Sequence, residues 1–158
     1  MSIPEGAAAV AQAKADGLDI SVETCPQYLA LTEDDLRRIG GVAKCDPPVR
    51  SRDAVDELWE HVIDGTIDIL ASDHSPHPFA KKVVPKDEFW KASEGVTGLQ
   101  TMIPVAVTEG VVKRGMSLCR LAAISSANVA RRFGLYPQKG VLAVGSDADF
   151  YLLDLHHE

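Results

Sequence analysis

The chain has 158 residues, 46% of them hydrophobic and 25% charged, which is the composition of one ordinary globular domain and excludes a disordered or fibrous protein. Its net charge of -7 comes from scattered acidic residues without a stripe of lysine or arginine, so we expect no nucleic-acid partner. No apolar run approaches the roughly 18 residues that span a bilayer, and Cys25, Cys45 and Cys119 form no C-x-x-C pair. We therefore expect a cytoplasmic protein without a membrane anchor, an export signal or a disulfide framework.

The first part of the chain alternates predicted helices and strands. Ser2 can cap an alanine-rich helix that continues to about Gly17. Residues 20–24 alternate apolar and polar side chains and predict a strand. Residues 32–35 then begin a short helix that ends near Gly40.

A strongly amphipathic helix is predicted between Ser51 and Gly65, which serve as its cap and its stop. Its apolar positions recur at the helical period: Val55, Leu58, Trp59, Val62 and Ile63. Residues 67–71 follow as a short apolar strand. This succession of helix, strand, helix and strand is typical of parallel βαβ units.

The second half is predicted to be mainly helical. Residues 78–94 have no periodicity and predict a long surface loop of the kind that often carries function. Residues 95–113 have a helical pattern, and Ser117 and Ser126 can each cap a further helix. Residues 141–153 predict two short strands around a Gly-Ser-Asp turn, the beginning of a second, β-rich module.

Polar residues follow the second predicted strand, in the string Ser72-Asp73-His74-Ser75-Pro76-His77. A carboxylate at the end of a strand in a parallel α/β unit lies where active sites of such folds are built, and it can bind a metal ion or move a proton. Pro76 prevents His74 and His77 from sharing a helix face, but both can line the mouth of a pocket. Such strings also form turns and helix caps, so spacing alone leaves a structural role open.

The segment from Lys44 to Arg50 contains two consecutive prolines, which hold the chain extended and rigid. It can present backbone groups to a ligand, or it can be a stiff connector with a solvated Arg50. Cys25 and Cys45 are expected to be small buried residues, because no histidine base accompanies either of them.

Several strings, taken in order and at their spacing, resemble those of allantoinases, which are cyclic amidohydrolases. They are ETCPQYL at 23–29, AKCDPPVR at 43–50, SDHSP at 72–76 and GVTGLQ at 95–100. Residues 126–135 and 140–149 are similar to the segment that leads such a chain from its barrel into a β-sandwich module. The resemblance covers essentially the whole chain.

The resemblance implies an α/β fold and the C-terminal part of a longer enzyme. Residues 1–138 would supply the last two strands of a (β/α)8 TIM barrel with their helices, and residues 139–158 the start of the C-terminal β-sandwich module. The chain would begin immediately after the metal-binding histidine of the sixth strand. The parent enzyme would be a homo-oligomer, a tetramer.

The resemblance also implies a site. In the family, two divalent metal ions, expected to be zinc, are held by a His-x-His pair, a carboxylated lysine, two further histidines and one aspartate. Of these ligands this chain has the aspartate, Asp73, which would bind the more exposed metal and carry the catalytic proton. Asp46 and the backbone of Gly95 and Val96 match substrate-contacting positions, and His77 matches a substrate-binding histidine of dihydroorotases.

The implied activity is the metal-dependent hydrolysis of a small cyclic ureide, in first place allantoin to allantoate in purine catabolism. This chain would supply part of the site and be inactive alone. Gln27 departs from the pattern, since many allantoinases have histidine there and hydantoinases have glutamine, and allantoinases often differ at His77 too. Open alternatives are a dihydropyrimidinase, hydantoinase or dihydroorotase-like enzyme, a non-catalytic scaffold homologue, and a mononuclear metal site made by Asp73, His74 and His77.

Overall fold

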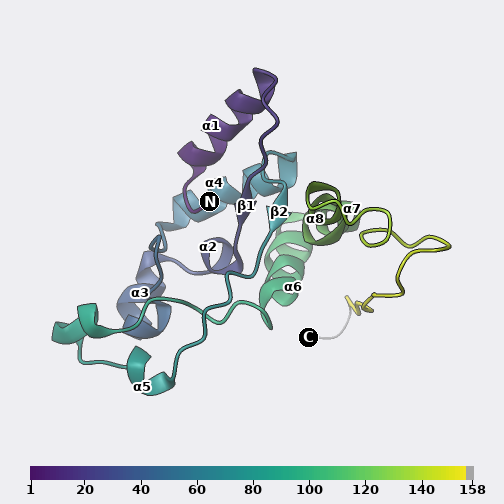
Figure 1. Ribbon diagram of the computed structural model, residues 1–158. Coiled ribbons are helices and arrows are strands. Elements are labelled where there is room, and N and C mark those ends of the chain that lie inside the picture. The colour runs from purple at the N-terminus through teal and green to yellow at the C-terminus, as the bar shows by residue number, and fades with distance from the viewer. Residues whose placement is uncertain (156–158) are drawn as a thin grey trace.

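The computed structural model describes residues 1–155, and residues 156–158, the end of the predicted second module, lie outside the described part. Two short parallel strands stand between groups of helices (Figure 1). The strands are β1 (Glu23–Thr24) and β2 (Ile69–Leu70). The helices are α1 (Pro4–Ala15), α2 (Pro26–Ala30), α3 (Glu33–Ile39), α4 (Arg52–Asp64), α5 (Phe79–Lys82), α6 (Met102–Val105), α7 (Leu118–Ala122) and α8 (Asn128–Arg132). The 3-10 turns η1 (Gly40–Ala43) and η2 (Lys86–Lys91) and the π-helical stretches η3 (Ala106–Val112) and η4 (Ala123–Ala127) complete the order.

The two strands pair in parallel, with Glu23 opposite Ile69 and Thr24 opposite Leu70. This confirms the predicted βαβ arrangement, although both strands are shorter than predicted. Backbone hydrogen bonds extend the contact by one residue on each side, since the Asp68 N–H donates to the Val22 carbonyl and the Ala71 N–H to that of Thr24, each at 2.9 Å. The parallel pairing means that both strands end at the same edge.

Helix α4 supplies much of the core. Val55, Leu58, Trp59 and Val62 are all buried, as the helical period predicted. The Trp59 indole N–H donates to the Leu29 carbonyl at 2.8 Å, so its one polar atom is satisfied inside the core. The prediction was wrong for Ile63, which is 39% exposed because its position on the helix is rotated to the flank of the buried stripe.

The predicted helix ends are confirmed at α3 and α4 but not at α1. Thr32 and Asp35 form a reciprocal capping box at α3, and Ser51 caps α4, which stops at Gly65 in the left-handed region (φ 104°). Ser2 was predicted to cap α1, but Ile3 takes that position without a side-chain hydrogen bond. The reason is that Met1 is bound to the chain of β1, where its ammonium group donates to the Glu23 carbonyl at 2.6 Å, and this leaves Ser2 buried.

The helical prediction for the second half holds in part. Residues 102–114 form one helix made of α6 and η3, but residues 95–101 do not belong to it, because Val96 is engaged in a backbone bridge with His74. Ser117 caps α7 through a hydrogen bond from the Arg120 N–H at 3.0 Å. Ser126 does not cap a helix, since it lies inside the continuous run of α7, η4 and α8.

Two further predictions require correction. Residues 78–94 are not a surface loop throughout, because they include α5 and η2 and bury Lys82. Residues 141–155 contain the predicted turn, where the Ser146 N–H donates to the Ala143 carbonyl at 3.1 Å, but no strand forms in this described part of the chain. A strand needs a neighbour to bond its backbone, and here none lies alongside.

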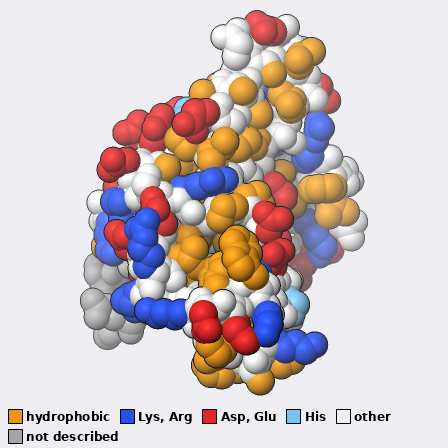
Figure 2. Space-filling model, turned by 90° about the vertical axis from the view of Figure 1, so that its left-hand side faces the viewer, with side chains coloured by type: hydrophobic (Ala, Val, Ile, Leu, Met, Phe, Trp, Pro, Cys, Tyr) orange, Lys and Arg blue, Asp and Glu red, His pale blue; other side chains and the backbone are white. Residues whose placement is uncertain are grey.

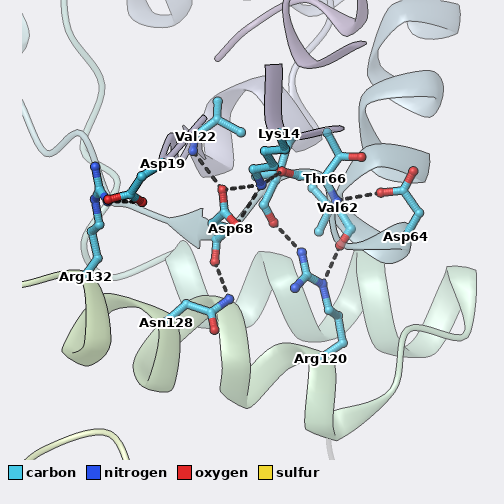
Figure 3. A network of polar contacts seen from close by, with 11 residues as sticks. Lys14, Asp19, Val22, Val62, Asp64, Thr66, Asp68, Arg120, Asn128 and Arg132 are labelled. Carbon is cyan, nitrogen blue, oxygen red and sulfur yellow. Dashed lines mark hydrogen bonds and ion pairs between the residues drawn. The ribbon is translucent and has the colours of Figure 1, made fainter. Parts of the chain in front are cut away.

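A polar network joins the beginnings of both strands to the surrounding helices (Figure 3). The Lys14 ammonium donates to both carboxylate oxygens of Asp68, at 2.8 and 2.7 Å, and the Val22 N–H donates to the same carboxylate at 2.8 Å. Asn128 donates to the Asp68 carbonyl at 2.9 Å, and Arg120 donates to the Val62 carbonyl at 2.6 Å. These contacts fix one end of the strand pair, leaving the other end for the groups described next.

Many apolar side chains remain on the surface. Figure 2 shows them across the middle of one face, bordered by acidic and basic groups. The most exposed are Val144, Leu152, Trp90 and Leu142. In the described residues, no helix has both the length and the apolar character required to cross a membrane.

Candidate active site

Asp73 lies just beyond the carboxyl end of β2 and is exposed. Its φ of 45° makes it the one residue other than glycine with a positive φ among residues 1–155. Aspartate and asparagine tolerate this left-handed backbone better than most residues, but it is still uncommon and often accompanies a functional site. The chain therefore turns sharply where the acid emerges.

Gln27 connects Asp73 to the other strand. It lies in the first turn of α2, directly after β1, and is 3% exposed. Its Nε2 donates to Asp73 Oδ2 at 2.7 Å, while its own Oε1 is buried with no partner among the described residues. The hydrogen bond fixes one oxygen of the carboxylate, and no described residue donates to the other, Oδ1.

The backbone of Gly95 and Val96 runs alongside the segment that follows Asp73. His74 and Val96 form a parallel bridge, and the Ser75 N–H donates to the Val96 carbonyl at 3.0 Å. Gly95 has a φ of 126°, and a Cβ there would lie 2.4 Å from the Ser75 hydroxyl oxygen. Only glycine fits this approach, which explains the residue type at position 95.

The loop around Asp46 borders the same region. The Gly95 N–H donates to the Lys44 carbonyl at 3.0 Å, and Tyr28 donates from its hydroxyl to the Pro47 carbonyl at 3.1 Å. Asp46 itself is exposed, and the Asp46-Pro47 peptide bond is cis. The segments around residues 27, 46, 73 and 95, far apart in the sequence, thus meet at the carboxyl ends of the two strands.

Arg50 is less exposed to solvent than expected if residues 44–50 were only a stiff connector. It is half-buried, and its Nε lies buried without a hydrogen-bond partner among the described residues. Its carbonyl accepts from the Glu33 N–H at 2.9 Å, which attaches the far end of the proline loop to the start of α3.

The two histidines after Asp73 lie at the edge of this region. His74 Nδ1 accepts from the Leu99 N–H at 3.2 Å, and exposed His77 approaches the Ser75 hydroxyl at 3.4 Å. The structure does not gather them with Asp73: in residues 1–155, no group of three or more His, Cys, Asp or Glu side chains could hold a metal ion. The mononuclear site considered from the sequence is therefore wrong, because His74 is engaged by the Leu99 N–H and His77 lies beside Ser75 instead.

Burial governs the acidity of the nearby thiols and phenol. Burial, together with the negative charge of Asp73, raises the pKa of Cys25 to about 12, and burial also raises the pKa of Cys45. The pKa of Tyr28 is likewise raised, first by burial. Both cysteines are buried as predicted, and they remain protonated at neutral pH.

A cavity of about 210 Å³ opens beside Gln27, between α2 and the segment 96–101. Its lining is mostly apolar and includes Leu31, Val96 and Val105. A larger cavity of about 260 Å³ lies between α3 and residues 84–89 and contains none of the predicted site residues. Arg37, the guanidinium in its wall, is already paired with Glu33 and Asp34, so the cavity beside Gln27 is the better candidate for a ligand.

Asp73 can supply one ligand to a metal centre, but the described residues around it cannot supply the others. Asp73 offers a hard carboxylate oxygen, Oδ1, to which no described residue donates. A metal site of fixed geometry needs three or four protein ligands, and no such cluster occurs in the described part of the chain. Any metal held here would need further ligands from other residues.

The sequence indicates no role in this region for Gln27 or Lys82. Gln27 differs from a family pattern, and Lys82 lies in a segment without periodicity that predicts a surface loop. Lys82 is 6% exposed, and its ammonium donates to three backbone carbonyls. No local pattern reveals such a role, because the partners are backbone groups from distant segments.

Comparisons with known proteins agree with the resemblance seen in the sequence. The chain is 46% identical to an L-hydantoinase of Paenarthrobacter aurescens over 98% of its length, and 45% identical to an allantoinase of Solibacter usitatus over the same share. It spans about a third of the length of these curated relatives.

Solved structures give the same result. An L-hydantoinase (dihydropyrimidinase) from Arthrobacter aurescens superposes with a TM-score of 0.90 at 46% identity, over 94% of this chain and 33% of that one. A dihydropyrimidinase from Brevibacillus agri superposes with a TM-score of 0.87 at 34% identity, over the same shares. The family model described as "Amidohydrolase family" matches residues 5–158, so this chain belongs to the amidohydrolase family.

Proposed function

We propose that this chain forms part of the active site of a metal-dependent hydrolase that opens cyclic amides, with Asp73 as its proton carrier and one of its metal ligands. The observation that carries the proposal is the meeting of Asp73, the Asp46 loop and the Gly95–Val96 backbone at the carboxyl ends of two parallel strands. Active sites of parallel α/β folds are built at that end.

The strands β1 and β2 are proposed to be two neighbouring strands of a (β/α)8 barrel. A barrel of this kind needs roughly 250 residues, so residues 1–138 would form only part of one. That they would supply its last two strands and their helices is carried over from the family resemblance. Residues 139–158 would begin a β-sandwich module. The proposal includes zinc as the metal, a homo-oligomeric parent enzyme, a tetramer, and a cytoplasmic location, all carried over from the family resemblance.

The role of Asp73 follows from its two oxygens. Oδ2 is held by Gln27, so Oδ1 is available to bind a metal ion, and the carboxylate keeps further lone pairs that can take up a proton. Two divalent ions, when bound, would lower the pKa of water toward about 7 and polarise the substrate carbonyl. Asp73 would accept the proton of the attacking hydroxide and return it to the departing ring nitrogen.

Substrate binding is assigned to backbone groups and to one side chain at the edge. The Asp46 loop and the backbone of Gly95 and Val96 would hold the ring in position for attack, and His77 would reach a substrate substituent. Rigid backbone suits this task, because the prolines at 47 and 48 and the bridge at Val96 limit its movement.

The preferred substrate is allantoin, opened to allantoate, and the second candidate is a hydantoin or dihydropyrimidine ring. Gln27 favours the second candidate, because in the family pattern glutamine occurs at this position in hydantoinases. Dihydroorotate is a third ring of the same class. As an isolated chain of 158 residues, without the remaining metal ligands, this protein is expected to be inactive.

The test is a chimaera in which this chain replaces the matching third of the Paenarthrobacter aurescens L-hydantoinase, called here the hydantoinase chimaera. We expect it to bind divalent metal and to hydrolyse at least one of allantoin, hydantoin and dihydroorotate, with relative rates identifying the substrate. Asp73→Asn should abolish turnover and retain the circular dichroism spectrum.

The control is Asp53→Asn, which changes an exposed aspartate in the first turn of α4. A folded, metal-loaded chimaera that opens none of these rings would favour a non-catalytic scaffold and defeat the proposal. Full activity in Asp73→Asn would overturn the role of that residue.

A further inference from the structure

Lys82 places a buried positive charge behind the proposed substrate loops. It ends the single turn of α5, and its side chain is 6% exposed. Its ammonium donates to the carbonyls of Lys44 at 2.9 Å, Ser93 at 2.9 Å and Gly95 at 2.7 Å. No carboxylate of the described residues forms an ion pair with it, so three carbonyl dipoles replace its water.

These carbonyls belong to both proposed substrate loops. Lys44 lies two residues before Asp46, and Gly95 precedes Val96. The Gly95 N–H donates to the same Lys44 carbonyl that Lys82 binds, at 3.0 Å. One ammonium therefore joins the Asp46 loop to the Gly95–Val96 backbone, and it does so from inside the protein.

A second lysine strengthens only part of this arrangement. The Lys44 ammonium donates to the Ala92 carbonyl at 2.9 Å and to that of Trp90 at 3.2 Å, and it lies 5.4 Å from the Phe89 ring centroid. The Lys44 ammonium holds residues 89–94 but does not reach Gly95. Of the two ammonium groups, only that of Lys82 bonds to the carbonyls of both loops.

Chemistry explains why lysine suits this position. An ammonium has three donors arranged around one atom and no acceptor, which matches three converging carbonyls. Burying a charge is costly, and here desolvation lowers the pKa of Lys82. A neutral side chain of similar length would leave the carbonyls of Ser93 and Gly95 without this donor, and the flat guanidinium of arginine could not meet three such partners at one point.

We propose that Lys82 is a positioning residue that sets the separation of the Asp46 loop from the Gly95–Val96 backbone, and with it the fit of the cyclic amide ring. The inference rests on the proposed function, because it assigns substrate contact to these two loops. Lys82 would touch neither substrate nor metal. Its loss should therefore weaken substrate binding more than it slows the chemical step.

The experiment uses Lys82→Met in the hydantoinase chimaera, with Lys81→Met as the matched control, because Lys81 is adjacent and exposed. We expect Lys82→Met to raise KM roughly 10- to 100-fold while kcat changes less than about 3-fold. Lys82→Arg should behave like Lys82→Met, and Lys81→Met like the parent chimaera. Equal KM values for Lys82→Met and the parent would overturn the inference.

Hydrogen exchange separates this inference from the proposed function. In Lys82→Met the Gly95 and Ser75 amides, which donate to Lys44 and Val96, should exchange faster, while the Val55 amide in α4 should not change. If the parent chimaera has no activity but Lys82→Met speeds this exchange, the proposed function is refuted and the connection of the two loops by Lys82 is supported. If the parent chimaera is active but Lys82→Met leaves the exchange unchanged, only the connection by Lys82 is refuted. If Lys82→Met fails to fold, Lys82→Arg carries both measurements.

Discussion

Gln27 donates a hydrogen bond to Asp73 at 2.7 Å across a sequence separation of 46 residues. One residue follows β1 and the other follows β2, so the contact exists because the strands are parallel and end at the same edge. The amide is buried, whereas the carboxylate is exposed. A rigid group thus orients a group that faces solvent.

Gln27→Leu should impair the proposed reaction without unfolding the protein. Leucine has a similar volume but no donor, so Asp73 would lose its fixed orientation. We expect kcat/KM of the hydantoinase chimaera to fall roughly 10- to 100-fold, as for other residues that orient a metal ligand. Steady-state kinetics with metal content measured in parallel will test this.

Gln27→Glu tests the same Gln27–Asp73 contact through the pH dependence of the rate. It places a second carboxylate against Asp73, and two ionised carboxylates repel at this distance. We expect the acid limb of the pH-rate profile to move to higher pH. An unshifted profile in Gln27→Glu, together with an unchanged kcat/KM in Gln27→Leu, would mean that the hydrogen bond has no catalytic consequence.

Asp68→Ala should destabilise the fold far from the proposed site. It leaves the Lys14 ammonium without a carboxylate, bonded only to the Thr66 carbonyl, and the Val22 N–H without its acceptor, both partly buried in the network of Figure 3. The expected cost is about 2 kcal/mol. The thermal midpoint of the chimaera, measured by calorimetry, should fall while kcat at 25 °C stays the same.

Asp19→Ala is the control for that variant. Asp19 pairs with Arg132 at 2.9 Å, but its side chain is 94% exposed, so solvent screens the pair. Its loss should cost no more than about 0.5 kcal/mol. Equal effects of the two variants would show that the network adds nothing beyond ordinary surface charge.

Alkylation should distinguish the three cysteines. Only the thiolate reacts, and because the pKa of Cys25 is raised to about 12, its thiolate is scarce at pH 8. Cys45 is also buried with a raised pKa, whereas Cys119 is exposed. We expect iodoacetamide at pH 8 to label Cys119 in the folded chimaera and all three in urea, as mapped by peptide mass spectrometry. Rapid labelling of Cys25 in the folded protein would contradict the burial described here.

The 158-residue chain expressed by itself should be aggregation-prone or partly molten. Both strands have only two residues and present unpaired edges, and Val144, Leu152 and Leu142 are more than 80% exposed. We expect binding of the dye ANS, weak near-ultraviolet circular dichroism and concentration-dependent association. A sharp, cooperative melt as a dilute monomer would be the contrary result.

The contrast between α4 and the segment 78–94 illustrates what a sequence pattern can predict. Helix α4 has its cap, its period and its stop within one stretch, so local chemistry predicted its bounds and its buried face. The segment 78–94 lacks any period, and its burial depends on carbonyls contributed by Lys44 and Gly95. No local rule could have predicted Lys82 to be buried.

The sequence by itself determined the parallel βαβ rhythm, the candidate acid Asp73, the buried cysteines and the family resemblance, because each can be read from residue types and their order along the chain. Only the tertiary structure decided that Gln27 holds Asp73, that Val96 pairs with His74 rather than starting a helix, and that Lys82 joins two loops. The physical reason is that hydrogen bonds between distant backbone and side-chain groups depend on how the strands are placed side by side. That placement is a property of the folded chain as a whole, and no periodicity within one segment predicts it.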